Sequence, residues 1–533
     1  MIDVLIIGSG GAGLSAALEA KKNGSNVLVV SKTYPTQSQT CQAQGGINGV
    51  LTKENSQDSI NSHIKDTIKS AHHIGDVATI KFMCENANDT ISWLDDIGVP
   101  FSRDTTNNIA QRKLGGASYP RACYSSDYTG LKILHTLYDN CLKENIEFLN
   151  ETMLLNFIIE ENTIKGITTL DIKTSEIKQI IAKTVIVASG GYGALYEGYT
   201  TNSNASTGDA IAAALRANVT IANMEYIQFH PTTLKMNSIL LSESARGEGG
   251  YLVTQDEKRF VDELAPRDVV ARAIEEKIKT GNEVFLDLRH LGLEKIQDVM
   301  PQEYDLALQF GGLKLDCDLI PIKPAAHYTM GGIKTNINCE TNINNLYAVG
   351  ECSSNGVHGA NRLGGNSLLE IVTFGRHVGK IASEKSSTVQ LDETIKSNQL
   401  ELDINFIETI FSMPNEVDFY FIKNQLGALF YSNVGLFRDT SSLDKALHQI
   451  QMYREQKSLM GITDKSKIYN TNLKEFLEFL NMLELGDTII LSALNRCESR
   501  GAHYRVDYPS ENSDFAKDSV IIKIDNDYKV ELV

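Results

Sequence analysis

Residues 3–20 read DVLIIGSGGAGLSAALEA, an apolar run that passes through glycines into strong helix formers. A second apolar run follows at residues 26–30. This order predicts a strand, a tight turn, a helix and a parallel strand. In the turn, Gly8, Gly10 and Gly13 fit the GxGxxG pattern, whose glycines let the backbone approach a pyrophosphate at a helix N-terminus. The stretch therefore predicts a Rossmann-like dinucleotide site, with a purely connecting glycine turn as the competing interpretation.

The end of the second strand departs from the general dinucleotide pattern. Ser31 and Lys32 stand where most such folds carry an Asp or Glu that binds the ribose, so NAD binding loses support. Further along the chain, Gln44-Gly45 and Asp209 lie in glycine-containing polar turns. These turns either line a long cofactor or serve as ordinary loops.

The pattern beyond the first unit predicts an α/β fold with additional domains. Apolar runs at 184–188 and 346–349 also end in glycine, and Glu351 follows the second, which predicts one parallel sheet whose carboxyl edge faces a ligand. Shorter mixed segments between 231 and 338 predict an inserted α+β domain. Helical spacing dominates 383–495, and residues 520–524 alternate like a strand.

Composition bounds the class of protein. The 533 residues exceed one usual hydrophobic core, and 42% hydrophobic with 22% charged residues is ordinary for a globular chain. A net charge of −17 argues against broad nucleic-acid binding. The eight cysteines have no ligand-like spacing, so no metal site is expected. We see neither an export signal nor a membrane-spanning run, and these features predict a cytoplasmic protein.

Cations beside glycine turns suggest an anion site. His230, Ser242 and Arg267 lie in three separate segments, and His327 and Arg362 form a fourth group from residues 327–328 and 358–362. A guanidinium fork matches a carboxylate bidentately. Each has a structural interpretation when taken singly, such as a salt bridge for Arg267 or a capped core histidine for His230.

Long motifs decide between these interpretations. They are IQFHPT at 227–232, APRDVVAR at 265–272, HYTMGG at 327–332, VHGANRLGGNSLLE at 357–370 and SRGAHYRVDYP at 499–509. With these motifs the chain, from residue 1 to about 509, resembles the flavoprotein subunits of succinate dehydrogenase and fumarate reductase and their relative L-aspartate oxidase. The resemblance implies a Rossmann-like FAD-binding domain at 1–230 and 339–382, a capping domain at 231–338, a helical C-terminal domain at 383–510 and a tail at 511–533.

The resemblance also implies roles for the candidate residues. The implied FAD ligands are Gly8, Gly10, Gly13, Ser31, Lys32, Gln44, Gly45, Asp209, Glu351, Arg362, Ser367 and Leu368. The implied ligands of a four-carbon dicarboxylate are His230, Ser242, His327 and Arg362. Arg267 matches the residue of the family that exchanges a proton, supplied through Glu243 and Arg246, while hydride moves between the flavin and the substrate.

One position departs from the respiratory members of the family. Gln39 stands where they usually carry the histidine that bonds the flavin covalently, so the resemblance implies non-covalent FAD. In this family the loss of the bond lowers the flavin potential and disfavours succinate oxidation, which suggests fumarate reduction as the favoured direction.

Two alternatives remain at this point. L-aspartate oxidase also holds FAD non-covalently, but it places a glutamate against the substrate amine, whereas this chain has the apolar Leu114. A catalytically silent flavin-binding module is the third interpretation. For a respiratory enzyme the resemblance implies an iron–sulfur subunit and a membrane anchor as separate chains, which would place this chain peripherally on the inner face of the cell membrane.

Overall fold

The computed structural model describes residues 1–51, 57–391, 397–524 and 527–533. Its largest sheet has seven strands, five of which run parallel in the order β6-β2-β1-β9-β16. Their bounds are Glu147–Asn150, Val27–Ser31, Ile2–Ile7, Ile177–Val187 and Leu346–Ala348. Helix α1, Gly11–Lys22, connects β1 to β2, so the predicted strand, turn, helix and parallel strand are confirmed.

Alternate residues of the central strand feed two separate cores. Val4 and Ile6 of β1 pack in one apolar cluster with α1, α5 (Thr129–Lys143) and α11 (Asn366–Ser386). Leu5 and Ile7 pack in the other, with α6 (Asp209–Arg216) and the C-terminal helices. Successive side chains of a strand point to opposite faces, so a sheet covered by helices on both faces needs a continuous apolar run.

The sheet continues beyond its parallel part. The first half of β9 pairs antiparallel with β8 (Thr163–Asp171), which pairs with β7 (Thr152–Glu160). The apolar run predicted a strand at 184–188, but the strand begins at Ile177, and two antiparallel strands that the pattern did not predict precede it. The carboxyl ends of the parallel strands nevertheless meet at one edge, as expected.

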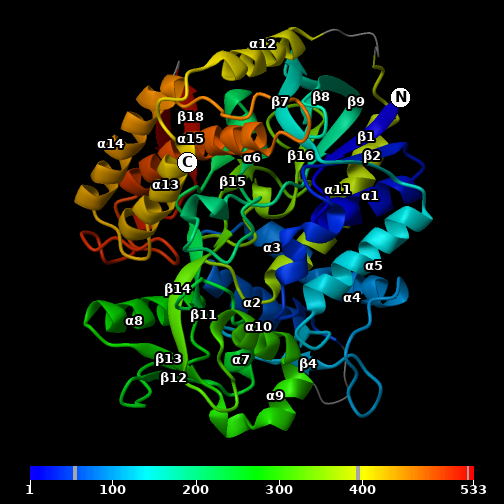
Figure 1. Ribbon diagram of the computed structural model, residues 1–533. Helices are drawn as coiled ribbons and strands as arrows, with labels where there is room; N and C mark the ends of the chain where they lie inside the picture. Colours follow the sequence, from blue (N-terminus) through cyan, green and yellow to red (C-terminus); the bar gives the residue numbers. More distant parts are fainter. Residues whose placement is uncertain (52–56, 392–396, 525–526) are drawn as a thin grey trace.

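A second lobe, the cap, occupies the lower part of Figure 1. Its antiparallel sheet has the order β11-β14-β13-β12, with bounds Ile227–Leu234, Ile320–Thr329, Val284–Asp287 and Tyr251–Thr254. The cap helices are α7 (Glu243–Gly247), α8 (Arg267–Lys279), α9 (Leu293–Val299) and α10 (Pro301–Gly311). Because the cap has an apolar core of its own, the expected inserted α+β unit is present. We propose limits of 227–329 for it, since residue 231 lies inside β11.

The C-terminal region is helical, as predicted. It comprises α12 (Asn398–Ser412), α13 (Phe419–Asn433), α14 (Thr440–Gln456) and α15 (Thr471–Asn495). The predicted tail strand is β18 (Ser519–Ile524), which pairs with β19 (Asp527–Leu532) and with β10 (Ile221–Ala222) of the large lobe. The chain end is thereby attached to the Rossmann-like domain through backbone hydrogen bonds.

The remaining α-helices pack in the apolar cluster that contains Val4 and Ile6, and the remaining strands are two or three residues long. They are α2 (Ile60–Ser70), α3 (Val77–Glu85), α4 (Ala87–Asp96), β3 (Ile47–Asn48), β4 (Gln111–Arg112), β5 (Ala122–Cys123), β15 (Gly332–Lys334) and β17 (Ser353–Ser354). No helix in the described ranges has the length and apolarity needed to cross a bilayer. Among those same residues, no cluster of His, Cys, Asp and Glu side chains could hold a metal ion.

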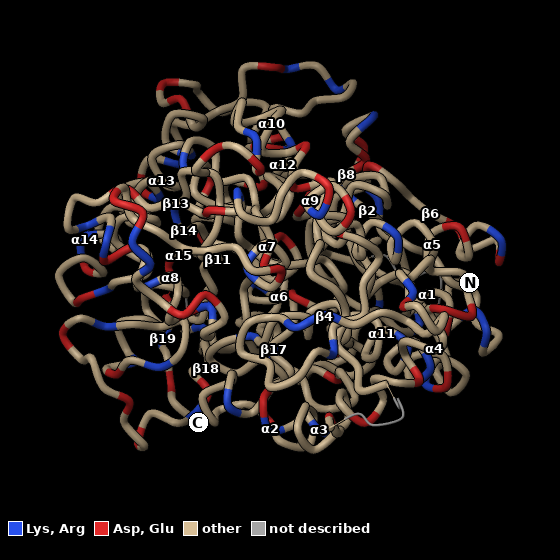
Figure 2. The backbone as a smooth tube through the Cα atoms, turned by 90° about the horizontal axis from the view of Figure 1, so that it is seen from below, with Lys and Arg blue, Asp and Glu red and all other residues tan. Residues whose placement is uncertain are grey.

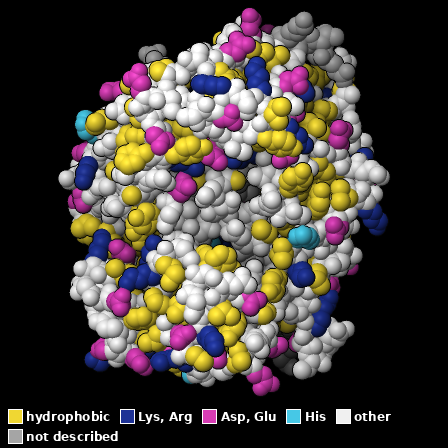
Figure 3. All heavy atoms as spheres, in the orientation of Figure 1, with side chains coloured by type: hydrophobic (Ala, Val, Ile, Leu, Met, Phe, Trp, Pro, Cys, Tyr) yellow, Lys and Arg dark blue, Asp and Glu magenta, His cyan; other side chains and the backbone are white. Residues whose placement is uncertain are grey.

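Charges are distributed over the whole molecule. In Figure 2, lysines and arginines alternate with aspartates and glutamates around the periphery of the tube. On the face in Figure 3, hydrophobic, basic and acidic side chains are interspersed. The excess negative charge is therefore spread over the surface. Arg246, Arg267 and Arg362, in contrast, are buried.

Candidate active site

A cavity lies between the carboxyl edge of the parallel sheet and the cap, and residues of both lobes line it. It brings together nearly all the residues that the sequence analysis selected: Gly8, Gly10, Ser31, Lys32, Gln44, Gly45, Leu114, Asp209, His230, Ser242, Glu243, Arg267, His327, Glu351, Arg362, Ser367 and Leu368. These residues are far apart in the chain, so their convergence is a product of the fold.

Two selected residues stand behind the lining. Gly13 faces β1 inside the molecule, where a Cβ would collide with the carbonyl oxygen of Gly8. It permits close packing of α1 on the strand. Arg246 is buried behind Glu243, with 3.9 Å between its Nη2 and Glu243 Oε1.

Helices α1 and α6 present their N-termini to one end of the cavity, whereas the N-terminus of α11 lies closer to Glu243. The N-cap residues of α1, α6 and α11 are Gly10, Gly208 and Gly365, none of which supplies a side-chain cap, and all three line the cavity. The first N–H groups of a helix lack partners within it and carry a partial positive charge. This end of the cavity is therefore suited to an anion such as a pyrophosphate.

Gly8 and Gly10 of the motif are glycines for different reasons, the first for the packing of the protein and the second for access to the cavity. A Cβ on Gly8, which has φ of +110°, would collide with the carbonyl of Ala188. A Cβ on Gly10 would come no closer than 3.5 Å to another protein atom, the Thr40 Oγ1. The packing of the protein therefore does not require a glycine at position 10. Because Gly10 lines the cavity, the absence of a side chain there lets a bound dinucleotide approach the backbone.

Lys32 joins three elements at this end. Its Nζ lies 2.5 Å from Asp209 Oδ2 on α6, 2.6 Å from Glu478 Oε1 on α15 and 2.8 Å from Thr207 Oγ1. Burial alone would lower the pKa of Lys32, but the two carboxylates raise it above its usual value. Lys32 and Asp209 therefore stay ionised and hold the wall of the cavity together.

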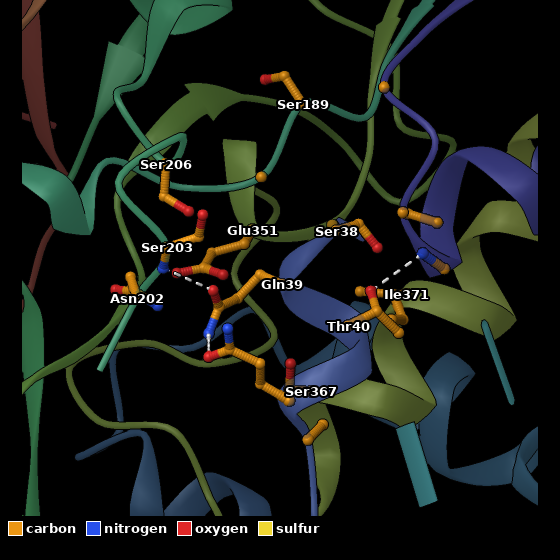
Figure 4. A pocket seen from close by; sticks show the side chains of 18 of the residues that line it. Ser38, Gln39, Thr40, Ser189, Asn202, Ser203, Ser206, Glu351, Ser367 and Ile371 are labelled. Carbon is orange, nitrogen blue, oxygen red and sulfur yellow. Dashed lines mark hydrogen bonds between the residues drawn. The ribbon is translucent and has the colours of Figure 1, made fainter. Parts of the chain in front are cut away.

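Gln39 occupies the wall of the same cavity (Figure 4). Its Oε1 accepts the N–H of Ser203 at 2.9 Å, and its Nε2 donates to Gln42 Oε1 at 3.1 Å. The amide is thus held by neutral hydrogen bonds. It offers no nucleophilic nitrogen to a cofactor.

Arg267 and Glu243 form a buried ion pair at the other end of the cavity. Arg267 begins α8, and its Nε donates to Glu243 Oε2 at 2.9 Å, while Nη1 donates to Gln228 Oε1 at 3.0 Å. Gln228 is itself fixed, because its Nε2 donates to Asn361 Oδ1 and to the carbonyl oxygen of Arg362. Burial would raise the pKa of Glu243, but Arg267 and Arg246 keep it below its usual value. Asp268, the sequence neighbour, pairs with Arg272 and not with Arg267.

Arg362 lies against Tyr328, with its guanidinium carbon 4.2 Å from the ring centroid. Within the described part of the chain its guanidinium has no carboxylate within ion-pair distance, and its buried Nε has no hydrogen-bond partner. Burial, together with Arg267, lowers the pKa of Arg362 to about 10, so it is still a cation at neutral pH. An unpaired buried guanidinium is costly, and an anionic ligand is the natural partner for it.

Two histidines complete this end. The rings of His230 and His327 lie 4.9 Å apart, and His327 Nδ1 contacts Thr201 Oγ1 at 2.7 Å. Burial and the nearby cations hold the pKa of both rings well below its usual value. They are neutral at physiological pH, and a His327 that accepts the Thr201 hydroxyl hydrogen carries its own hydrogen on Nε2, where it can be donated to a ligand.

The charges of this end favour a doubly negative ligand. Three guanidiniums, those of Arg246, Arg267 and Arg362, gather around the ionised carboxylate of Glu243. Glu263, which also lies near Arg246, is paired with Arg259, and burial raises the pKa of the nearby Glu303 and Glu351 to about 7. The excess positive charge faces a cavity that also has neutral donors. A dicarboxylate would balance it.

Three residues of this end carry no assignment in the sequence analysis: Thr201, Gln228 and Glu303. Gln228 stood inside a selected motif, but a single glutamine gives no sign of contacting an arginine 39 positions away. Thr201 and Glu303 lie outside every motif, so only the fold brings them to the site.

Comparison with known proteins agrees with the geometry. The family model described as "FAD binding domain" matches residues 3–368, and the one described as "Fumarate reductase flavoprotein C-term" matches residues 423–532. The chain is 36% identical to a succinate dehydrogenase flavoprotein subunit of Rickettsia conorii, over 99% of this chain and 94% of the relative. It is 37% identical to the 8-methylmenaquinol:fumarate reductase flavoprotein subunit of Wolinella succinogenes, over 99% and 90%.

Solved structures show the same similarity. An Escherichia coli quinol fumarate reductase chain superposes with a TM-score of 0.95 at 32% identity, covering 100% of this chain and 96% of the other. Mycobacterium smegmatis Sdh1 superposes with a TM-score of 0.87 at 29% identity, covering 100% and 94%.

Proposed function

Because this chain belongs to the succinate dehydrogenase/fumarate reductase flavoprotein family, we propose that it transfers hydride between FAD and a four-carbon dicarboxylate. The observation that carries the proposal is the meeting of two different sites in one cavity. Uncapped helix N-termini line one end, and Arg267, His327 and Arg362 line the other. The family and the geometry therefore point to the same pair of ligands.

The residues of the first end, together with Arg362, Ser367 and Leu368 from around the N-terminus of α11, would hold the cofactor. Gly8, Gly10, Gly13, Ser31, Lys32, Gln44, Gly45, Asp209, Glu351, Arg362, Ser367 and Leu368 are the proposed FAD contacts. When bound, the flavin supplies hydride acceptance and donation. The chain's own contribution is to neutralise the pyrophosphate with helix N–H groups and to place the cavity's second end against the ring.

The residues of the second end would bind, orient and protonate the substrate. Arg362, His230, Ser242 and His327 would hold the two carboxylates through charge and hydrogen bonds. Arg267 would exchange a proton with a substrate carbon, and Glu243 and Arg246 would relay protons to it from deeper in the cap. The Glu243 oxygen that faces Arg246 has no hydrogen-bond partner among the described residues, which leaves it free to accept one.

Fumarate reduction is the proposed favoured direction, with FAD held non-covalently. Gln39 supports this, since its side chain lies in the cofactor wall without a nucleophilic nitrogen. Precipitating the protein in acid should release all the flavin into the supernatant. Flavin that stays with the pellet would contradict the non-covalent part of the proposal and leave the reaction class intact.

L-aspartate oxidase is the disfavoured second candidate. The curated relatives reported above are succinate dehydrogenase and fumarate reductase subunits. In the structure the buried Leu114 lines the cavity and offers no charge to a substrate ammonium group.

A pair of assays on the isolated chain tests the proposed reaction. Anaerobic protein with reduced viologen should bleach the dye on addition of fumarate. L-aspartate with oxygen should give no peroxide. Peroxide from L-aspartate without dye bleaching would assign the protein as an L-aspartate oxidase. No reaction in either assay would indicate a flavin-binding module without catalytic activity.

The proposed function also requires partner chains that carry electrons to or from the flavin. The chain matches proteins named as subunits, and chains of quinol fumarate reductase, along its whole length. We propose an iron–sulfur subunit as the electron-transfer partner and a membrane anchor beyond it. The protein would then associate peripherally with the inner face of the cell membrane.

A further inference from the structure

Glu303 forms a hydrogen-bond cluster behind the substrate end of the cavity. It is the third residue of α10 and fully buried. Its Oε1 accepts the hydroxyl of Ser244 at 2.6 Å and also contacts the hydroxyl of Ser242, and the two hydroxyls contact each other. Of the three, only Ser242 lines the cavity. Glu303 therefore has hydrogen-bond access to a ligand through Ser242, and we call these three residues the serine–glutamate cluster.

No cation neutralises Glu303. Within the described residues it has no ion pair at 4.0 Å or less, and its Oε2 is buried without a hydrogen-bond partner. The charged groups that face it are Asp127, which precedes α5 and accepts the Glu303 backbone N–H at 2.9 Å, Arg112 on β4, and Arg246 on α7. This arrangement favours a neutral carboxyl group, because an unpaired carboxylate is costly to bury.

The titration of Glu303 falls in the physiological range. Burial and the nearby Asp127 raise its pKa to about 7, against the opposing effects of Ser242, Ser244 and Arg112. Burial raises the pKa of Asp127 to about 6. The proton on Glu303 is thus present below neutrality and lost above it.

The hydrogens of the cluster can be counted. An ionised Glu303 only accepts, so both serine hydroxyls must donate to its Oε1, and no hydroxyl hydrogen is left for a ligand in the cavity. A neutral Glu303 brings a hydrogen of its own. It can donate to one serine, which releases the hydrogen of Ser242 toward the cavity.

We propose that Glu303 is a positioning residue that admits a dicarboxylate to the cavity when it is protonated and opposes it when it is ionised, acting through the hydroxyl of Ser242. The inference rests on the proposed function. An ionised Glu303 would also cancel part of the excess positive charge of Arg246, Arg267 and Arg362, so charge and hydrogen-bond direction act in the same sense. Binding of a dicarboxylate would in turn cause uptake of a proton by the cluster.

Malonate, a dicarboxylate that this chemistry cannot reduce, is a suitable probe. The flavin-loaded protein is titrated with malonate between pH 6 and 8.5, and the change in flavin absorbance reports the Kd. For a single linked proton the Kd should weaken by about tenfold per pH unit above pH 7. The KM for fumarate should rise in parallel, while kcat changes less.

Two variants isolate Glu303 from the other buried carboxyls. In Glu303→Gln the amide donates to a serine at every pH, so the Kd for malonate should vary by less than about threefold over the range. Glu303→Met removes both the titratable charge and the hydrogen-bond partner of the serines, so its Kd for malonate should also show no step with pH. The exposed Glu294→Gln on neighbouring α9 is the matched control and should keep the wild-type profile. Flavin content and melting temperature check that each variant folds.

The outcomes separate the inference from the proposed function. If wild type binds malonate and reduces fumarate but Glu303→Gln keeps the wild-type pH slope, the inference is wrong and the function stands. If wild type neither binds malonate nor reduces fumarate, the proposed function fails and the inference falls with it. Flat profiles in Glu303→Gln and Glu303→Met, with the wild-type slope kept in Glu294→Gln and fumarate reduction intact, support both.

Discussion

Arg267 is the residue on which the proposed proton transfer depends. Its guanidinium contacts Glu243 and Gln228 and faces the cavity, whereas Arg272, one turn later on α8, pairs with Asp268 and the Gly501 carbonyl. The substitution Arg267→Gln should lower fumarate turnover by roughly 10²- to 10⁴-fold, the usual contribution of a positioned acid, with flavin content unchanged.

The matched control on the same helix is Arg272→Gln, which should keep turnover while losing a partly buried ion pair. Both variants are measured by viologen-linked fumarate reduction and by the ratio of flavin to protein absorbance. A flavin-loaded Arg267→Gln with wild-type turnover would remove Arg267 from the mechanism.

Lys32 carries a second prediction at this scale. In Lys32→Met the carboxylates of Asp209 and Glu478 lose their shared cation, so the free energy of unfolding near pH 7 should fall by about 3–5 kcal/mol. The lysine keeps the pKa of Asp209 below its usual value, despite the opposing effect of burial, so this stabilisation is present above the unfolded pKa and lost as pH falls through the folded one. The difference between variant and wild type should therefore persist from pH 7 down to about pH 4 and shrink only below it, as followed by thermal unfolding. A constant difference would contradict the ion-pair account.

At the scale of elements, the turn between β1 and α1 separates the demands of folding from those of binding. Gly8→Ala would drive a Cβ into the Ala188 carbonyl at a positive φ and should lower protein stability itself. Gly10→Ala meets no protein atom closer than 3.5 Å, so the fold should survive while FAD affinity falls by at least about tenfold.

The comparison uses the apoprotein of each variant. Circular dichroism melting reports the fold, and fluorescence titration with FAD reports the affinity. A Gly10→Ala protein that melts early yet binds FAD as wild type does would reverse the roles given to the two glycines.

The same elements show what the sequence could predict. The β1–α1–β2 unit is local, and apolar periodicity with glycine punctuation sufficed for it. Strands β7 and β8 form a local hairpin with Glu161 and Asn162 between them, which the glycine-terminated runs did not indicate. The pairing of β18 with β10 joins segments remote in sequence, which a local pattern cannot predict. The long motifs and the family resemblance selected most of the residues that meet in the cavity, while their roles stay predictions. Glu303 was not selected, because a glutamate in a short helix is ordinarily exposed.

At the scale of the molecule, one buried network fastens the C-terminal region to the large lobe. Arg496, at the end of α15, is fully buried, and its Nε donates to Glu225 Oε1 at 2.6 Å. Its other nitrogens donate to the carbonyls of Phe515 and Lys517 in the tail, and Ser519 donates to Glu225 Oε2 at 2.7 Å. Three parts of the chain that are distant in sequence therefore share one guanidinium.

Removing that guanidinium should loosen all three parts together. Arg496→Met leaves Glu225 buried without its cation, which should cost about 3–5 kcal/mol, whereas the double variant Arg496→Met/Glu225→Gln should recover part of it because no isolated charge remains. Hydrogen exchange should show the loss first in β18 and β10, since the tail carbonyls lose their donors. If the single variant melted with wild type, or if the double variant were less stable than the single one, the network would not be what holds the tail on the large lobe.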